Sequence, residues 1–248
     1  MNSEPSKTFS GQVAVVTGAG SGIGAALAQA LAQGGAMVYL VGRRQSQLDA
    51  LQAQLFNAGH QAIARPCDLD RDEDIYSLRE QIGNEQSQLN LLVHSAGTIV
   101  LGGIESAPIA DFDKQYRTNV RAPYLLTQAL LPLVKHAQGE IVFINSSAGM
   151  HTKEQIGAYA ATKHALRAVA DTLRLEVNAH GVRVLSVYPG NTATAMQSTV
   201  QNYTGRRIAD AYLLQPEDVA ATVIHALLLP RTAEITDIQI RPFRKAPA

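Results

Sequence analysis

The chain has 248 residues, 46% of them hydrophobic, which suffices for the buried core of a single α/β domain. Its 21 basic and 21 acidic residues balance, so charge gives no reason to expect nucleic acid or an anionic membrane as a partner. The only cysteine, Cys67, excludes an internal disulfide, and the seven histidines lack a metal-binding spacing such as HExxH. We therefore expect no metal, an unreactive Cys67 and a small-molecule partner.

The first ten residues are polar and lack the apolar core of a signal peptide. No apolar run approaches the roughly 18 residues that a membrane span needs. We expect a cytoplasmic protein, with residues 1–10 flexible.

A buried strand at Val13–Thr17 and a helical run at Ala25–Gln33 flank a glycine-rich segment. Such a strand, turn and helix form a phosphate site, because glycines let the backbone approach the anion and free N–H groups face it. The segment comprises Gly18, Ala19, Gly20, Ser21, Gly22, Ile23 and Gly24.

Strand and helix signals then alternate along the chain. The other expected strands are Met37–Val41, Gln61–Pro66, Leu89–His94, Glu140–Asn145, Arg183–Tyr188 and Glu234–Ile240. This alternation predicts an α/β fold, a doubly wound parallel sheet in the order 3-2-1-4-5-6-7. Ligands bind such sheets at the carboxyl ends of the strands, where the glycine turn, Asn145 and Ser146 fall.

Tyr159 and Lys163 lie four residues apart on a helix expected from Tyr159 to His180, and Ser146 precedes Tyr159 by thirteen positions. Residues i and i+4 share a helix face, so the ammonium lies near the phenol and would lower its pKa. The pair is an acid/base device.

These pieces resemble the short-chain dehydrogenase/reductase family, in its branch of chains of this length, over nearly the whole sequence. The matches, in the order of the family, are Thr17-Gly18-x-x-x-Gly22-x-Gly24, Asp68, Ala96-Gly97, Asn119, Ser146-x-x-Gly149, Tyr159-x-x-x-Lys163, and Pro189-Gly190 with Thr192 and Thr194. The resemblance implies a single Rossmann-fold domain and hydride transfer between a nicotinamide cofactor and a carbonyl or alcohol.

The second strand ends where NAD-binding proteins carry an acidic residue for the ribose hydroxyls. Here Gly42 is followed by Arg43 and Arg44, which favour a 2′-phosphate and hence NADP(H). A solvated helix start is the alternative for the two arginines. Ser21 stands where some NADP-binding relatives carry a basic residue.

By resemblance, the other cofactor contacts are Gly18, Ser21, Gly22, Ile23, Gly24, Asp68, Leu69, Ala96, Gly97, Tyr159, Lys163, Pro189, Gly190, Thr192 and Thr194. Helix capping is an alternative role for Asp68 and for the two threonines. His94 and Ser95 depart from the usual Asn-Asn, and we expect His94 to be a buried, hydrogen-bonded histidine.

In the implied mechanism Tyr159 is the general acid in reduction and the base in oxidation. Lys163 lowers the pKa of Tyr159, together with the positive nicotinamide, and holds the nicotinamide ribose. Ser146 orients the carbonyl, with Ser147 as a competitor for this role. Asn119, on a long helix from Asp111 to His136, bends that helix around a proton-relaying water.

The substrate pocket implied by the resemblance holds Ile99, Val100, Met150, His151, Ile156, Met196, Tyr203 and Tyr212. This mixture indicates an uncharged, partly apolar carbonyl compound. A 3-oxoacyl carrier-protein reductase is an alternative, although the Asp-Gly-Gly tail common in those enzymes is missing. A catalytically silent NADP(H)-binding sensor and a sugar-nucleotide epimerase or dehydratase are the others.

The helix expected from Tyr159 to His180 has more apolar positions than one core-facing stripe needs. A second face of that helix would pack on another subunit. The family commonly pairs it and the Asp111–His136 helix across a two-fold axis. We therefore expect a homodimer or homotetramer.

Overall fold

The computed structural model describes residues 8–244, which form one α/β domain. Its single sheet has seven parallel strands in the order β3-β2-β1-β4-β5-β6-β7, which confirms the prediction. The strands are β1 (Val13–Thr17), β2 (Met37–Gly42), β3 (Ala62–Pro66), β4 (Leu91–His94), β5 (Glu140–Ile144), β6 (Arg183–Pro189) and β7 (Asp237–Ile240).

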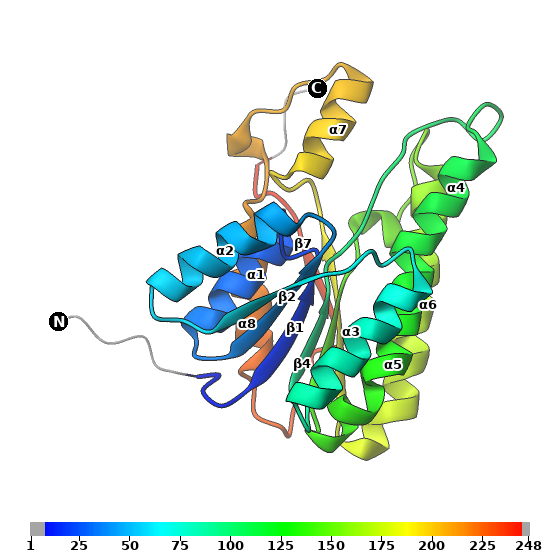
Figure 1. Ribbon diagram of the computed structural model, residues 1–248. Helices are drawn as coiled ribbons and strands as arrows, with labels where there is room; N and C mark the ends of the chain where they lie inside the picture. The colour runs from blue at the N-terminus through cyan, green and yellow to red at the C-terminus, as the bar shows by residue number, and fades with distance from the viewer. Residues whose placement is uncertain (1–7, 245–248) are drawn as a thin grey trace.

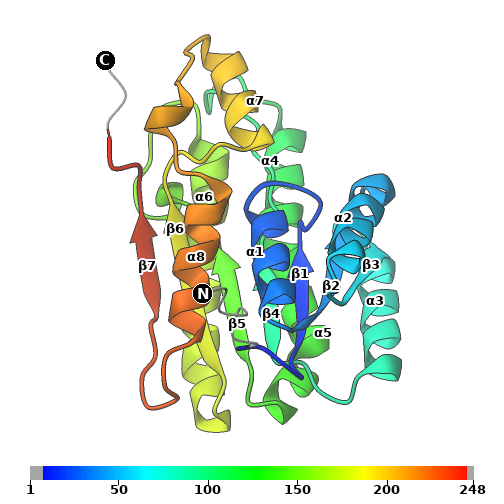
Figure 2. The ribbon, with the colours of Figure 1, turned by 90° about the vertical axis from the view of Figure 1, so that its left-hand side faces the viewer.

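Helices cover both faces of the sheet, and Figures 1 and 2 show the resulting three layers. One face is covered by α1 (Gly22–Gln33), α2 (Gln45–Asn57) and α8 (Pro216–Leu227). The other is covered by α3 (Asp72–Glu85), α5 (Ala122–His136) and α6 (Gly157–Val177). Two further helices, α4 (Ile109–Tyr116) and α7 (Ala195–Thr204), lie toward the carboxyl ends of the strands.

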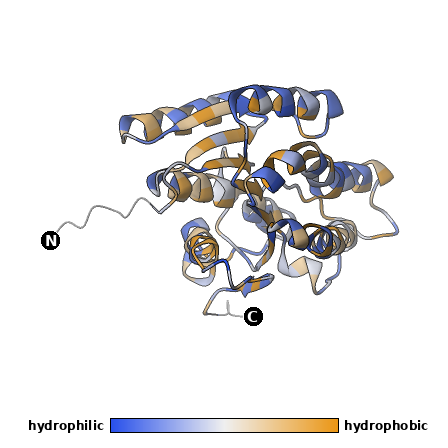
Figure 3. Ribbon diagram, turned by 90° about the horizontal axis from the view of Figure 1, so that it is seen from below, coloured by the Kyte–Doolittle hydropathy of each residue, from blue (hydrophilic) through white to orange (hydrophobic). Residues whose placement is uncertain are grey.

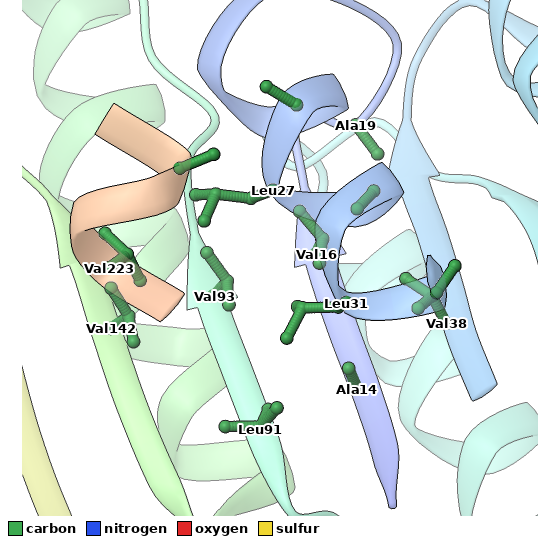
Figure 4. Packing of buried hydrophobic residues seen from close by; sticks show 14 of the residues in the cluster. Ala14, Val16, Ala19, Leu27, Leu31, Val38, Leu91, Val93, Val142 and Val223 are labelled. Atoms are coloured by element: carbon green, nitrogen blue, oxygen red, sulfur yellow. The ribbon is translucent and has the colours of Figure 1, made fainter. Parts of the chain in front are cut away.

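Every residue of β1 is buried, because consecutive side chains of a strand point to opposite faces and both faces are covered. Ala14 and Val16 belong to the core cluster that contains residues of α1 and α8, whereas Val13 and Val15 belong to the cluster under α3, α5 and α6. Figure 4 shows the first cluster, with Leu27 of α1 reaching toward the strands. In Figure 3, which shows the domain from below, the strands in the interior are mainly coloured as hydrophobic, whereas the helices around them carry both colours.

Strand β1 has its predicted bounds, and each of the other strands differs from its prediction at one end, by one to three residues. The largest shift is at β7, which begins at Asp237 instead of Glu234, because the Glu234 carboxylate accepts a hydrogen bond from the backbone N–H of Val184. The strand predicted from Leu89 begins at Leu91, since the side chain of Asn90 caps β1 through the N–H of Val13.

The predicted single helix Asp111–His136 is corrected to three segments. After α4, residues Arg117–Arg121 form a π-helical turn that leads directly into α5. Pro123 has no N–H to donate to the Asn119 carbonyl in the α-helical pattern, so the helix widens here. The N–H of Ala122 accordingly bonds to the Arg117 carbonyl, five residues back.

The two other predicted helices also change at their ends. The helix expected from Ala25 starts at Gly22, inside the glycine-rich turn. The helix predicted to reach His180 ends as α6 at Val177, and a 3₁₀ turn continues to His180 before Gly181 in left-handed conformation, φ 71°. Of residues 1–10, expected to be flexible, 1–7 lie outside the described range. Phe9 is buried and bonded to Gly34, so residues 8–10 are anchored.

Candidate active site

The glycine-rich turn joins β1 to α1 and is built for close backbone approach. Gly18 has φ +67°, and a Cβ there would lie 2.9 Å from the backbone nitrogen of Ala96. A Cβ on Gly24 would lie 2.4 Å from the Gly18 carbonyl oxygen, so α1 packs tightly on the strand end. The first turn of α1 contains no acidic residue, which leaves the positive end of the helix dipole available to an anion.

The segments predicted to contact a cofactor meet at this turn. The Thr17 hydroxyl accepts hydrogen bonds from the N–H groups of Ser95 and Ala96, at 3.0 and 3.1 Å, and so fixes the Ala96-Gly97 segment beside β1. Thr194 lies on the other side, since a Cβ on Gly22 would be 3.0 Å from its methyl carbon. The residues present therefore fit a dinucleotide.

Arg43 and Arg44 follow β2 at the same edge of the sheet and are exposed. The Arg44 guanidinium lies 3.4 Å from the Ser21 hydroxyl, which brings the second strand end and the glycine turn together. Among residues 8–244, neither arginine forms a salt bridge. The two guanidiniums therefore have no carboxylate partner and lie beside the glycine-rich turn. They are suited to bind a phosphate group in addition to those at the turn.

Asp68 and Leu69 follow β3, where the N–H of Cys67 bonds to the Gly42 carbonyl. The alternative role of Asp68 as a helix cap is wrong, because the N-cap position of α3 is Arg71. The Asp68 carboxylate instead accepts a hydrogen bond from the backbone N–H of Asp70, at 3.2 Å. Burial raises the pKa of the Cys67 thiol to about 12, so the thiol stays protonated, as an unreactive cysteine would.

At the end of β6, Gly190 bonds to the Ile240 carbonyl of β7, and the Thr192 hydroxyl donates to the carbonyl of Gly190. Thr194 is the N-cap of α7, where its hydroxyl accepts the N–H of Gln197 at 3.3 Å. The capping alternative thus holds for Thr194, and it leaves a cofactor contact open to the same hydroxyl. Pro189 is the last residue of β6, one residue beyond the predicted end.

Tyr159 and Lys163 lie on the buried face of α6, with 6% and 3% of their surface exposed. The Lys163 ammonium is 5.8 Å from the centre of the Tyr159 ring and donates to the Ile144 carbonyl at 3.1 Å. Burial raises the pKa of Tyr159, and a hydrogen bond from Ser146 opposes that rise. Burial also lowers the pKa of Lys163 to about 8.

The expected lowering of the Tyr159 pKa therefore does not arise in the protein alone. Desolvation is the largest influence on the pKa of each group, because both are removed from water at the carboxyl end of β5. Ser146 is the N-cap of a 3₁₀ turn and accepts the N–H of Ala148, which fixes its hydroxyl beside Tyr159. Ser147, the competitor, is exposed.

Asn119 lies in the π-helical turn and is buried. Its side-chain oxygen accepts the N–H of Thr98, and its amide donates to the Thr98 carbonyl and to the Thr162 hydroxyl at 3.1 Å. The sequence reasoning missed Thr162, which donates in turn to the Tyr159 carbonyl. Its only sequence signal is a polar side chain on the core-facing stripe of α6, next to Lys163.

His94 is buried, stacks on Phe143 and shares a 2.8 Å hydrogen bond with Thr127, as predicted. Within the described residues, no group of three or more His, Cys, Asp or Glu side chains is arranged for a metal ion. Nor does any helix there have the length and apolarity to cross a membrane.

The family model of short chain dehydrogenases matches residues 12–204. The chain belongs to this family. It is an oxidoreductase with the family's Rossmann-type fold, and the recognised motifs fall within one continuous domain.

Among its relatives, an uncharacterized oxidoreductase of Staphylococcus aureus strain MRSA252 is 31% identical over 93% of this chain and 97% of its own length. The glycine betaine reductase ATRR of Emericella nidulans is 32% identical over 96% of this chain, which spans only 19% of that protein. A metagenomic short-chain oxidoreductase crystallised with NADP superposes with a TM-score of 0.83 and 31% identity, over 96% of this chain and 100% of its own.

Proposed function

We propose that this oxidoreductase interconverts a ketone or aldehyde and the corresponding alcohol, with NADP(H) as cofactor and Tyr159 as general acid/base. The observation that carries the proposal is the buried group at the end of β5, where Ser146 lowers the pKa of Tyr159 and the Lys163 ammonium lies 5.8 Å from the centre of the phenol ring. When bound, the cofactor supplies the hydride.

The protonation states suit reduction. Hydride addition to a carbonyl creates negative charge on oxygen, which requires a proton donor and a hydrogen-bond donor at that atom. Burial keeps Tyr159 protonated near neutral pH, so it would supply the proton, and the Ser146 hydroxyl would hold the same oxygen. Lys163 would bind the nicotinamide ribose and Asn119 would serve the proton relay.

Oxidation of an alcohol requires the ionised phenol, which the protein alone disfavours. The positive charge of oxidised nicotinamide would then have to lower the pKa of Tyr159. We expect the oxidation rate to rise with pH along one ionisation and the phenol to titrate at lower pH when NADP+ is present.

The cofactor assignment has two supports. The chain carries Arg43 and Arg44 without a carboxylate at the end of β2, and the metagenomic relative was crystallised with NADP. The predicted contacts would distribute the cofactor along the carboxyl ends of the strands, with Asp68 and Leu69 at the adenine and Gly18 to Gly24 at the pyrophosphate. Pro189, Gly190, Thr192 and Thr194 would lie at the nicotinamide end.

Apolar side chains pack on one side of Tyr159. Ala148 is buried against Tyr159, and Ile99 and Ile156 pack on the same small cluster. A charged group beside the reacting carbonyl would lose its hydration there without a partner. The substrate class is therefore an uncharged carbonyl compound with an apolar substituent.

A panel of carbonyl compounds tests the proposal by NADPH oxidation at 340 nm. It includes alkyl aryl ketones, aliphatic aldehydes, a 3-oxoacyl thioester and a cationic aldehyde, the last because one relative is a glycine betaine reductase. We expect turnover of the uncharged ketones or aldehydes. Tight NADPH binding without turnover of any compound would identify a cofactor sensor instead.

Replacement of Tyr159 by Phe tests the mechanism. It removes one hydroxyl and leaves the ring, so NADPH binding should persist while kcat falls by roughly 10²–10⁴, the range of general acid–base catalysis. Ser146→Ala should lower kcat more than Ser147→Ala, its exposed neighbour. Near-normal turnover in the Phe variant would overturn the role of Tyr159.

A further inference from the structure

Met196, in the first turn of α7, covers the catalytic tyrosine. Its sulfur lies 4.0 Å from the Tyr159 hydroxyl oxygen, at the outer limit of a sulfur hydrogen bond. Tyr159 is only 6% exposed, although a substrate must reach its hydroxyl.

The thiomethyl group of Met196 extends further into the site. A Cβ placed on Gly97 would lie 3.8 Å from Met196 Cε and 3.8 Å from Lys163 Nζ. The side-chain oxygen of Asn119 would lie 3.4 Å from the same Cβ. The thiomethyl group, the ammonium and Asn119 therefore meet at Gly97, on the side of the site where Met196 approaches the phenol.

The helix that carries Met196 is attached loosely to the domain. None of the residues of α7 is buried, and Figure 1 shows the helix standing above the carboxyl ends of the strands. The helix starts after Thr194, in extended conformation, and ends at Gly205 with φ +68°. Movement of α7 would therefore cost few buried contacts.

A thioether is a poor hydrogen-bond acceptor, whereas a carbonyl oxygen is a good one. Only one of the two can take the proton of the Tyr159 hydroxyl. The unbranched methionine side chain has three rotatable bonds and can withdraw without unfolding the helix. A carbonyl oxygen would thus displace the sulfur at small cost.

We propose that Met196 is a specificity-determining residue, whose side chain holds the place of the reacting carbonyl at Tyr159 and limits the size of the substituent beside that carbonyl. This inference rests on the proposed carbonyl chemistry. It adds that the substrate displaces the Met196 thioether, and that the volume left by the displaced side chain determines which substituents fit.

Met196→Ala and Met196→Leu test the inference against Thr199→Ala, an exposed position on the same helix. The two probes are acetophenone, with a methyl group beside the carbonyl, and butyrophenone, with a propyl group. One methylene in an apolar pocket changes kcat/KM by roughly 10- to 200-fold. We expect Met196→Ala to raise the butyrophenone/acetophenone ratio of kcat/KM at least about tenfold, while Met196→Leu, which conserves volume, and Thr199→Ala retain the original ratio.

A second measurement needs no turnover. N-acetylimidazole acetylates accessible tyrosines, and peptide mass mapping reports the rate at Tyr159. We expect faster acetylation of Tyr159 in Met196→Ala than in the parent protein and in Thr199→Ala.

If that rate does not change, Met196 does not cover the phenol and the inference is overturned. If the rate rises but no carbonyl is reduced, the cover is real and the proposed function fails. Unchanged substrate ratios in an active Met196→Ala enzyme would remove its role in specificity.

Discussion

Tyr159 and Lys163 are both buried, and burial moves their pKa values in opposite directions, upward for the phenol and downward, to about 8, for the ammonium. Both groups are thereby biased toward their neutral forms. Sequence spacing alone suggested the opposite for Tyr159, because it accounts for the neighbouring charge and not for the loss of water. In the proposed mechanism, the positive charge of the oxidised cofactor would favour ionisation of the phenol.

Residue 42 is expected to control cofactor choice. Because Gly42, Arg43 and Arg44 end β2 without a carboxylate, NADPH should bind more tightly than NADH. The double substitution Gly42→Asp with Arg43→Ala should reverse that order. An Asp carboxylate accepts hydrogen bonds from the ribose hydroxyls of NADH and repels the 2′-phosphate of NADPH. Titration of both cofactors by nucleotide fluorescence measures this, and equal affinities in the parent protein would contradict it.

His94 should make the fold sensitive to acid. Burial lowers the pKa of its imidazole from 6.5 to about 3 in the folded state. As pH falls below about 6.5, the unfolded chain gains a proton that the folded chain does not, so the free energy of unfolding decreases by up to about 1.4 kcal/mol per pH unit. This loss of stability does not occur above about pH 6.5, and it stops increasing near pH 3, where the folded protein is protonated as well.

Urea unfolding of the parent and of His94→Asn, which carries the usual residue of the family, measures the contribution between pH 7 and 5. The variant should lose less stability over this interval. His225→Asn, at an exposed position, is the matched control and should follow the parent. Parallel profiles for all three proteins would show that His94 does not titrate on unfolding.

At the scale of elements, Arg183 joins the amino-terminal end of β6 to the segment that leads from α8 to β7. Its guanidinium pairs with the Glu140 carboxylate of β5 and donates to carbonyls of Leu227, Leu229, Pro230 and Ala233. Glu140 and Arg183 are largely buried, with 14% and 11% of their side chains exposed. The Arg183 side chain thus supplies hydrogen bonds to backbone carbonyls that are not paired within the sheet.

Arg183→Met should lower the free energy of unfolding by about 3–5 kcal/mol, because it removes the guanidinium that donates hydrogen bonds to the largely buried Glu140 carboxylate and to several carbonyls. Arg231→Ala is the comparison, since Arg231 is half exposed and lies 3.6 Å from the same carboxylate. A loss of about 1 kcal/mol or less is expected there. Similar losses in both variants would show that the two arginines are equivalent.

At the scale of the whole molecule, α6 has a second face of small residues. Its buried stripe includes Leu166, Ala170 and Leu173, whereas Ala161 and Ala168 are exposed. On the neighbouring helices Tyr116 and Tyr124 are 45% and 57% exposed, which leaves aromatic surface beside α6. We expect two-fold packing of these helices in a homodimer or homotetramer.

Light scattering at micromolar concentration should therefore give a multiple of the chain mass. Ala168→Arg should lower that mass, because a long charged side chain cannot enter a close helix contact. Ala221→Arg, at an exposed position of α8, should leave the mass unchanged. A monomeric parent protein would exclude the assembly.

The sequence by itself predicted the strands, the glycine turn and the Tyr159 and Lys163 pair from local patterns: continuous apolar runs, a glycine-rich segment and a four-residue helical spacing. The strand order followed from the rule of right-handed crossovers, and the choice of Ser146 from the resemblance to the family. Only the tertiary structure decided the π-helical turn at Asn119, the link from Thr162 to that turn, the direction of the Tyr159 pKa and the approach of the Met196 sulfur to the Tyr159 hydroxyl. Each of these arises where residues far apart in the chain meet and exclude water. Desolvation and contact across the fold have no counterpart in residue spacing.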